Sequence, residues 1–283
     1  MSRIFYIFII CFSFFKLSSQ TTDSEDFRIK SYFNRDSIFS LRGKVEDGLL
    51  KLWFAYPEFI KGVREDALIW KDNTIMLYRD TFCEKIKDTM LVYPDLDDMM
   101  TYEYDAGMFY TPDSNCIAGR VRYEPFFRKM YGNTKEEVLG KLHKMAWVPK
   151  IYVQNIYITK VNNIHKKLQK VSNELQKLPK EFHKYLKNIG GTFNWRPIKN
   201  TNGTRMSLHS FAIAIDISTK HGKYWDWVKD MDGKFEYQNE IPIEIVQIFE
   251  KHGFIWGGRW HNFDTMHFEY RPELLLDWGP ILK

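Results

Sequence analysis

A single aspartate inside an apolar run is the feature that most constrains how this chain can fold. Asp216 follows the apolar residues 212–215 and precedes Ile217, a pattern typical of a buried β-strand. A buried carboxylate is costly unless it is paired or bound to a metal ion. Ala212 and Ala214 alternate with Asp216 and leave room on its face of the strand. The run therefore predicts a polar site on a strand or, more ordinarily, an Asp at a strand end.

Two histidines could join this aspartate. His209 lies seven positions before Asp216, and a fully extended strand would point their side chains to opposite faces. We therefore expect a turn or bulge between them, which Ser210 and Ala212 permit. His267 lies between two apolar residues, and alone it would more often be a structural histidine. Together, two imidazoles and one carboxylate suit zinc, and three protein ligands leave one position open for water.

Hydrolysis at such a centre needs further groups. Zinc polarises a carbonyl and makes a bound water more acidic, and a nearby carboxylate must carry the proton to the leaving amine. Asp264, three positions before His267, is the candidate base. Arg196 is the candidate for stabilising the oxyanion. It could instead bind a substrate carboxylate or be an ordinary surface arginine.

The two segments resemble the motifs of a known peptidase family. Residues 207–216 resemble the Ser-x-His-x-x-Gly-x-Ala-x-Asp signature of the M15 metallopeptidases, the D-alanyl-D-alanine carboxypeptidase family. Residues 264–268 resemble its second motif, in which an acid precedes the third zinc ligand. The resemblance extends over residues 180–283. It implies zinc as cofactor, peptidoglycan peptides as substrate and a compact α+β fold, with a small antiparallel sheet and flanking helices as in the hedgehog and D,D-peptidase catalytic domain.

The sequence departs from the family pattern at two positions. Ala212 stands where the family usually has Gly, which is tolerated at a negative φ and strained at a positive one. Asp264 stands where many members have Glu, although some, including phage endopeptidases, have Asp. Four further residues near the site are expected to contact substrate: Ser207, Trp256, Trp260 and His261.

The leading functional interpretation is removal of a C-terminal D-Ala from peptidoglycan stem peptides. The alternatives are an L-alanyl-D-glutamate type of endopeptidase, a non-catalytic cell-wall-binding module, and a zinc-bearing signalling domain. A cleft closed at one end by a carboxylate-binding arginine, such as Arg196, Arg120 or Arg122, would favour the carboxypeptidase. A complete catalytic set argues against pure binding.

The N-terminus predicts export to the periplasm or the exterior. Residues 1–20 combine an early Arg3, an apolar run over residues 4–15 and a small, polar exit, as in a secretory signal peptide. The run is shorter than the ~20 apolar residues of a membrane span, so no stable span is expected after processing; an uncleaved anchor is the alternative. Cys83 and Cys116 could pair in an oxidising compartment.

The remaining chain divides into a leader (21–45), an extension packed on the core (46–150) and the catalytic domain (151–283). The patterns predict these elements: a hairpin over 67–78; helices over 134–142, 161–178, 180–186 and 242–251; and strands over 151–159, 192–196, 211–217, 254–256 and 266–270. Helices segregated from short strands indicate an α+β fold.

The distribution of charge bears on partners. The net charge of +5 is scattered, and no nucleic-acid-binding module is recognisable. The chain is therefore expected to act as a monomer on a peptide substrate, without nucleic acid. Asp95, Asp97 and Asp98 lack the pattern of a calcium loop, and we interpret them as a solvated acidic loop.

Overall fold

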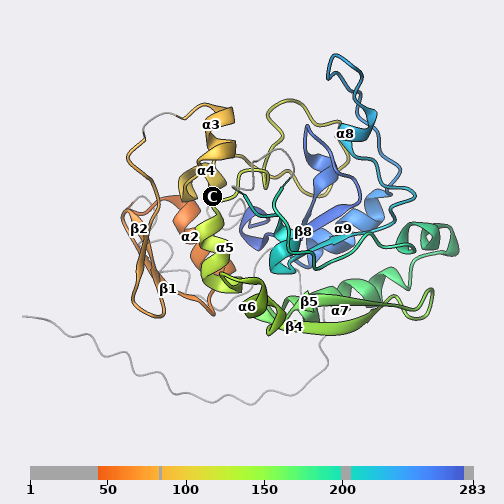
Figure 1. Cartoon of the computed structure of the whole chain (residues 1–283), viewed down its shortest axis with the longest axis horizontal. Helices are drawn as coiled ribbons and strands as arrows, with labels where there is room; N and C mark the ends of the chain where they lie inside the picture. Colours follow the sequence, from red (N-terminus) through yellow and green to blue (C-terminus); the bar gives the residue numbers. More distant parts are fainter. Residues whose placement is uncertain (1–43, 83–84, 199–204, 277–283) are drawn as a thin grey trace, which may run out of the picture.

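The computed structural model describes residues 44–82, 85–198 and 205–276. Within them, the chain forms short antiparallel sheets and helices (Figure 1). They share a hydrophobic core whose residues extend from Leu49 to Tyr270. The predicted α+β class with small antiparallel sheets is confirmed, while the likeness to a hedgehog-type domain stays a prediction. No helix of the described part is long and apolar enough to cross a membrane. The predicted signal peptide and leader lie outside the described residues, apart from residues 44 and 45.

The sheet that carries the site has the strand order β6–β8–β7. These strands span Ala214–Asp216, His267–Tyr270 and Phe254–Trp256. In the antiparallel pairing of β6 with β8, Asp216 lies opposite His267. Directly opposed residues point to the same face of a sheet. The register therefore brings two predicted ligands from distant parts of the chain to one place.

Helix α9 packs on this sheet, and helix α7 packs on α9. Helix α9 spans Ile243–Lys251, and its Phe249 ring stacks on the Phe268 ring of β8 at 3.8 Å between centroids. Helix α7 spans Ile164–Leu175 and packs against α9. The α7 residues at helical spacing form its buried face, as predicted: Ile164, Leu168, Val171 and Leu175. The short helix predicted over 180–186 is present as a 3-10 helix, η2 (Lys180–Leu186).

The N-terminal part contains a second sheet and several helices. Strands β1 (Ile60–Arg64), β2 (Ala67–Trp70) and β3 (Ile75–Leu77) pair in order, which confirms the hairpin predicted over 67–78. The helices of this part are α2 (Asp47–Ala55), α3 (Lys87–Val92), α4 (Leu96–Met100), α5 (Glu124–Tyr131) and α6 (Lys135–Leu139).

The predicted domain boundary after residue 150 lies in the connection between two paired strands. Strands β4 (Leu142–Trp147) and β5 (Gln154–Thr159) form a two-stranded sheet across it. The hydroxyl of Tyr56 at the end of α2 also donates to Glu273 at 2.6 Å. Division at 150 stays a prediction, but the two parts share backbone pairing and buried polar contacts.

Besides β5 and α7, which are shorter than predicted, three predicted elements differ from the structure in extent or type. Residues 192–196 form no strand, because Asn194 and Arg196 direct their backbone N–H groups to the 207–210 segment and not to a strand ladder. The helix predicted over 134–142 ends at Leu139, since residue 142 already begins β4. The strand predicted over 211–217 is shortened to β6, because a 3-10 turn occupies residues 208–211.

The predicted solvated acidic loop is also wrong. Asp95 and Asp98 are buried and cap α4 reciprocally, each side chain accepting from the other's backbone N–H at 2.8 and 2.9 Å. The Lys85 ammonium donates to both carboxylates and to Asp80. We call these four residues the Lys85 cluster. Burial of the acids became possible because a cation from outside their own run joins them.

Candidate metal centre

A tight turn precedes β6 and aims the first histidine. The 3-10 helix η3 spans Leu208–Phe211, and the Ser207 hydroxyl accepts from the His209 backbone N–H at 3.4 Å. Ala212 ends η3 in the left-handed conformation, with φ 52° and ψ 40°. This is the predicted reversal between His209 and Asp216. The positive φ also means that Ala212 is strained, at a cost of roughly 1–2 kcal/mol relative to a right-handed conformation.

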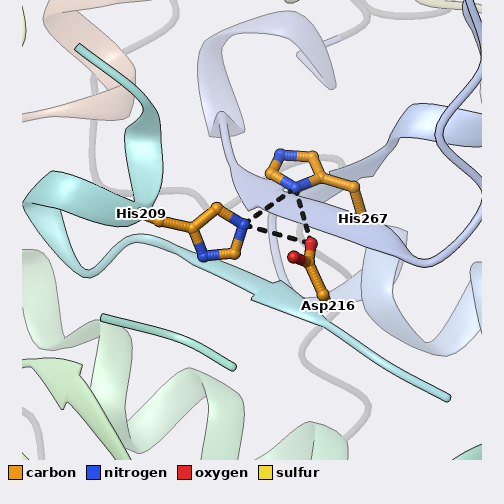
Figure 2. A group of neighbouring side chains, drawn as sticks. All are labelled: His209, Asp216 and His267. Carbon is orange, nitrogen blue, oxygen red and sulfur yellow. Dashed lines mark hydrogen bonds and ion pairs between the residues drawn. The ribbon is translucent and has the colours of Figure 1, made fainter. Parts of the chain in front are cut away.

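The structure brings His209, Asp216 and His267 together (Figure 2). His209 Nε2 lies 3.1 Å from Asp216 Oδ1 and 3.2 Å from His267 Nδ1. His267 Nδ1 lies 2.9 Å from the same Asp216 oxygen. The histidine side chains are buried, while that of Asp216 is 22% exposed, so the group is open on one side.

In both histidines, the ring nitrogen that faces away from the centre, here called the outer nitrogen, already makes a hydrogen bond. His209 Nδ1 donates to the Thr192 carbonyl oxygen at 2.7 Å, and His267 Nε2 donates to Glu269 Oε2 at 2.9 Å. A neutral imidazole carries one N–H, so both inner nitrogens then present lone pairs. Hydrogen bonding of the outer nitrogen is the usual way a protein orients a metal-binding histidine. When both rings are neutral, two nitrogen lone pairs and a carboxylate oxygen therefore converge on one point, where a cation can bind.

The electrostatics of the group call for a positive charge. Burial disfavours a charged ring, yet hydrogen bonds to Asp216 and Glu269 raise the pKa of His267 to about 9. Burial also disfavours an ionised Asp216, but the charges and hydrogen bonds of His209 and His267 hold its pKa well below the usual range. The arrangement stabilises a cation at its centre, whether a proton or a metal ion.

The donor set fits zinc. Tetrahedral zinc with nitrogen ligands at 2.0–2.1 Å separates neighbouring donors by about 3.3 Å. The three donor separations here are 2.9, 3.1 and 3.2 Å. Two imidazoles and one carboxylate, with one side open, match the ligand set of a catalytic site.

Asp264 starts the turn that leads into His267. The His267 backbone N–H donates to the Asp264 carbonyl at 3.1 Å, and the Asp264 N–H donates to Gly257 at 3.0 Å. Its Oδ1 atom is buried without a hydrogen-bond partner among the described residues. Burial, together with the negative charge of Asp216, raises the pKa of Asp264 to about 6. Asp264 is thus a fixed carboxylate with a free acceptor atom and a pKa suited to proton transfer.

Trp260 and Arg120 form a layer beside this carboxylate. The Trp260 ring is 5.5 Å from the His267 ring, and its indole N–H donates to the Ala118 carbonyl at 2.6 Å. The Arg120 guanidinium lies 5.2 Å from the centroid of Trp260. Burial lowers the pKa of Arg120, against the attraction of Tyr224, Asp264 and Glu269. Arg120 is therefore a half-buried cation whose field acts on Asp264.

The other predicted site residues lie in different surroundings. Arg196 is exposed, and no contact joins its side chain to the metal-binding group among the described residues, so its catalytic role stays a prediction. Trp256 is 1% exposed in the core, where its indole N–H donates to Thr265 at 2.8 Å. His261 is half-buried, with its ring 5.3 Å from Phe235. Substrate contacts at Ser207, Trp256, Trp260 and His261 stay predictions, and burial leaves Trp256 little surface for one.

Sequence reasoning missed Glu269. Its carboxylate is fully buried and accepts from His267, while Arg122 and Arg271 balance its charge. Together these neighbours lower its pKa to about 2, against the effect of burial. The available signal was spacing, because a residue two positions after His267 on a strand shares its face. Thr192 gave no comparable signal, since it contributes a backbone carbonyl.

Comparison with known proteins supports the motif assignment. Residues 201–270 match the family model described as D-alanyl-D-alanine carboxypeptidase, of the M15 peptidases. The matched segment contains His209, Asp216, Asp264 and His267. No curated protein and no solved structure matches the chain. The match confirms the resemblance to M15 peptidases and supports a hydrolase acting on peptides.

Proposed function

We propose that this chain, whose residues 201–270 match the M15 peptidase family model, is a zinc-dependent peptidase that removes the C-terminal D-Ala of peptidoglycan stem peptides. The observation that carries the proposal is the convergence of three lone-pair donors, from His209, Asp216 and His267, next to the unpaired buried oxygen of Asp264. A structural zinc site would be closed by a fourth ligand and would need no separate carboxylate.

The residues of the chain have separate roles in the proposed hydrolysis. His209, Asp216 and His267 would hold zinc, which supplies polarisation of the scissile carbonyl and acidifies water. Asp264 would take a proton from the attacking water through its free Oδ1 atom and return it to the leaving amine. The turn between Asp264 and His267 keeps the base in fixed register with one ligand, because a backbone hydrogen bond of 3.1 Å closes it.

A developing oxyanion needs a fixed positive donor. Arg196 was the candidate from sequence, but its side chain is exposed. Arg120 is half-buried, and its charge acts on Asp264. We therefore favour Arg120 for this role. Replacing each arginine separately by Gln and comparing kcat discriminates between them, since only the true donor should lower kcat strongly.

The primary test uses residues 21–283 loaded with zinc and incubated with stem peptides ending in D-Ala. Mass spectrometry should show loss of one terminal D-Ala. Asp264→Asn keeps the size of the side chain and removes the base, so it should bind zinc and release no product. Asp66→Asn is the matched control, because Asp66 is an exposed carboxylate at the β1–β2 turn, where its side chain pairs with Arg64.

The outcomes separate the alternatives. An internal cut would identify an L-alanyl-D-glutamate type of endopeptidase with the same centre. Zinc and peptide binding without any cleavage would favour a non-catalytic wall-binding module. Such a peptidase meets its substrate outside the cytoplasm, so export through residues 1–20 is part of the proposal. N-terminal sequencing of the mature protein from the envelope fraction tests it, and an intact Met1 on protein retained inside the cell would contradict it.

A further inference from the structure

The segment that leads into helix α8 runs alongside the candidate base. Helix α8 spans Trp225–Val228 (Figure 1), and the residue before it, Tyr224, forms an isolated antiparallel bridge with Asp264. Backbone hydrogen bonds of 2.9 and 2.8 Å flank the bridge, from Trp225 to Phe263 and from Thr265 to Lys223. The two segments are therefore paired in a fixed register at Asp264.

This register decides where the Tyr224 side chain points. Directly opposed residues of an antiparallel pair point to the same face. The Tyr224 side chain therefore lies on the face of the pair that carries the Asp264 side chain. Tyr224 is half-buried, so part of its side chain stays accessible to a ligand bound beside Asp264.

Two indole rings restrain the phenol ring of Tyr224. The Tyr224 ring meets the Trp225 ring edge-on at 6.0 Å and the Trp227 ring edge-on at 5.7 Å between centroids. Aromatic pairs prefer such edge-to-face arrangements. A donor whose position is fixed in advance can stabilise a developing charge without reorganising at the moment of reaction.

The charges that act on this phenol come from the active site. Burial raises the pKa of Tyr224, the positive charge of Arg120 opposes the rise, and the negative charge of Asp264 adds to it. Burial lowers the pKa of Arg120, and Tyr224 and Asp264 oppose that change. The ordinary pKa of a tyrosine is about 10, so the phenol keeps its proton at neutral pH.

The hydroxyl proton is not committed to a neighbouring acid. Within the part of the chain that the structure describes, Asp264 and Asp226 act on the Tyr224 phenol through their charge and not through a hydrogen bond. A phenol can donate one hydrogen bond. Tyr224 is therefore a neutral donor that faces the side of the base and remains available to a substrate.

We propose that the Tyr224 hydroxyl is a second catalytic donor, which forms a hydrogen bond to the carbonyl oxygen of the scissile bond as that oxygen becomes negative. This inference rests on the proposed function and assigns a further residue to the same reaction. The water oxygen bonds to the scissile carbon, an electron pair of the C=O bond moves to the carbonyl oxygen, and the water proton passes to Asp264. The C=O bond then re-forms as the C–N bond breaks, and Asp264 gives the proton to the leaving nitrogen. The phenol keeps its own proton throughout.

A neutral donor adds a contribution that differs from that of Arg120. The charge of Arg120 acts on the Asp264 carboxylate even before a substrate binds. A hydrogen bond from a neutral phenol is about twice as strong to an ionised acceptor as to a neutral one. The contact with Tyr224 therefore strengthens as the oxyanion forms, and interactions of that kind raise kcat.

A phosphinate analogue of the stem peptide tests the proposal without turnover, because its tetrahedral phosphorus replaces the scissile carbon and its negative oxygens imitate the oxyanion. Titration calorimetry compares zinc-loaded wild type with Tyr224→Phe, which keeps the ring and removes the hydroxyl. The variant should bind the phosphinate about 100-fold more weakly, the loss typical of one oxyanion donor. Tyr123→Phe should bind it as wild type does. Tyr123 is the matched control, since it is also half-buried and its pKa is raised by burial and by Asp95, beside the Lys85 cluster.

Cleavage of stem peptides gives the second measurement. In Tyr224→Phe, kcat per bound zinc should fall about 100-fold, while KM and zinc affinity stay close to those of wild type. Turnover by wild type with an unchanged kcat and phosphinate affinity in Tyr224→Phe overturns the role of Tyr224 and leaves the peptidase standing. A loss confined to KM or to zinc affinity overturns it as well, because the hydroxyl would then serve binding or structure. A wild-type chain that neither cleaves the peptide nor binds the phosphinate overturns both proposals.

Discussion

Two clusters of polar side chains in this molecule, the Lys85 cluster and the metal centre, differ in the charge at their centre. In the Lys85 cluster, the Lys85 ammonium lies 2.5 Å from Asp80, 3.1 Å from Asp95 and 2.7 Å from Asp98. In the metal centre, two imidazole nitrogens and one carboxylate oxygen face one another with no protein cation between them. The first group contains its own positive charge, and the second requires one from solution.

The comparison shows why a count of acids is a poor guide to metal sites. The Lys85 cluster has more carboxylates, yet its lysine is only 4% exposed and is surrounded by them. Such a group serves the start of α4 through the cap at Asp95. The metal centre has a single acid, but its donors are oriented from outside by Thr192 and Glu269. Oriented lone pairs without a protein cation among them indicate a cation site more strongly than a large number of carboxylates does.

The largest expected effect comes from removing a ligand. His267→Ala should lose about 2.5–4 kcal/mol of zinc binding, roughly one quarter of the ~10–16 kcal/mol measured for four-ligand zinc sites. Competition with a chromophoric chelator measures the change. If His267→Ala keeps the wild-type zinc affinity, His267 is not a zinc ligand, and the contrast between the two clusters is wrong.

The next effect should appear in the other group. Lys85→Met leaves the surrounding carboxylates without their cation, and breaking a buried ion pair costs about 3 kcal/mol. Urea unfolding should show this loss while zinc affinity stays unchanged. Lys229→Met is the control, since its pair with Asp226 is 40% exposed on the lysine side and should contribute little. A fall in zinc affinity for Lys85→Met would mean that the two groups are not independent.

A smaller effect on zinc tests the orientation of the donors. Glu269→Gln keeps the shape of the side chain but weakens the hydrogen bond to His267, and loss of such an outer partner costs about 10–100-fold in metal affinity. Glu273→Gln is the comparison, because Glu273 is equally buried and bonded to Arg271 but does not contact His267. Equal zinc affinities in the two variants would show that Glu269 serves stability alone.

The smallest effect concerns the turn that aims His209. Ala212→Gly should stabilise the chain by up to about 1 kcal/mol, because glycine adopts a positive φ without strain. Ala214→Gly, on the regular strand β6, should instead destabilise by a similar amount. Thermal unfolding should show a higher melting temperature for Ala212→Gly and a lower one for Ala214→Gly. If both lose stability equally, the left-handed conformation of Ala212 carries no strain.

The sequence allowed prediction of what is local or periodic. The buried face of α7 and the strands β7 and β8 followed from spacing, and the turn before Asp216 followed from the parity of its distance to His209. The ligands could be proposed because rare polar residues interrupt apolar runs. These signals lie within short segments, where neighbouring residues constrain one another directly.

Long-range partners could not be predicted in the same way. The acids at 95–98 looked solvated because their counter-ion, Lys85, lies ten positions before Asp95 in the chain. Glu269 acquires its role from Arg122, which is 147 positions away. The segment 192–196 has strand-like composition, but its backbone bonds to the turn at 207–210. In each case a tertiary contact, invisible to local pattern, decided the structure.

A buried series of side-chain contacts connects the segment that matches the family to residues far upstream. From His267 it passes through Glu269, Arg271 and Glu273 to the Tyr56 hydroxyl at the end of α2. The segment that matches the family begins at residue 201, yet two of the groups that neutralise or cap this series, Arg122 and Tyr56, come from far upstream. Transplanting residues 201–270 into another protein would carry the ligands without their electrostatic support.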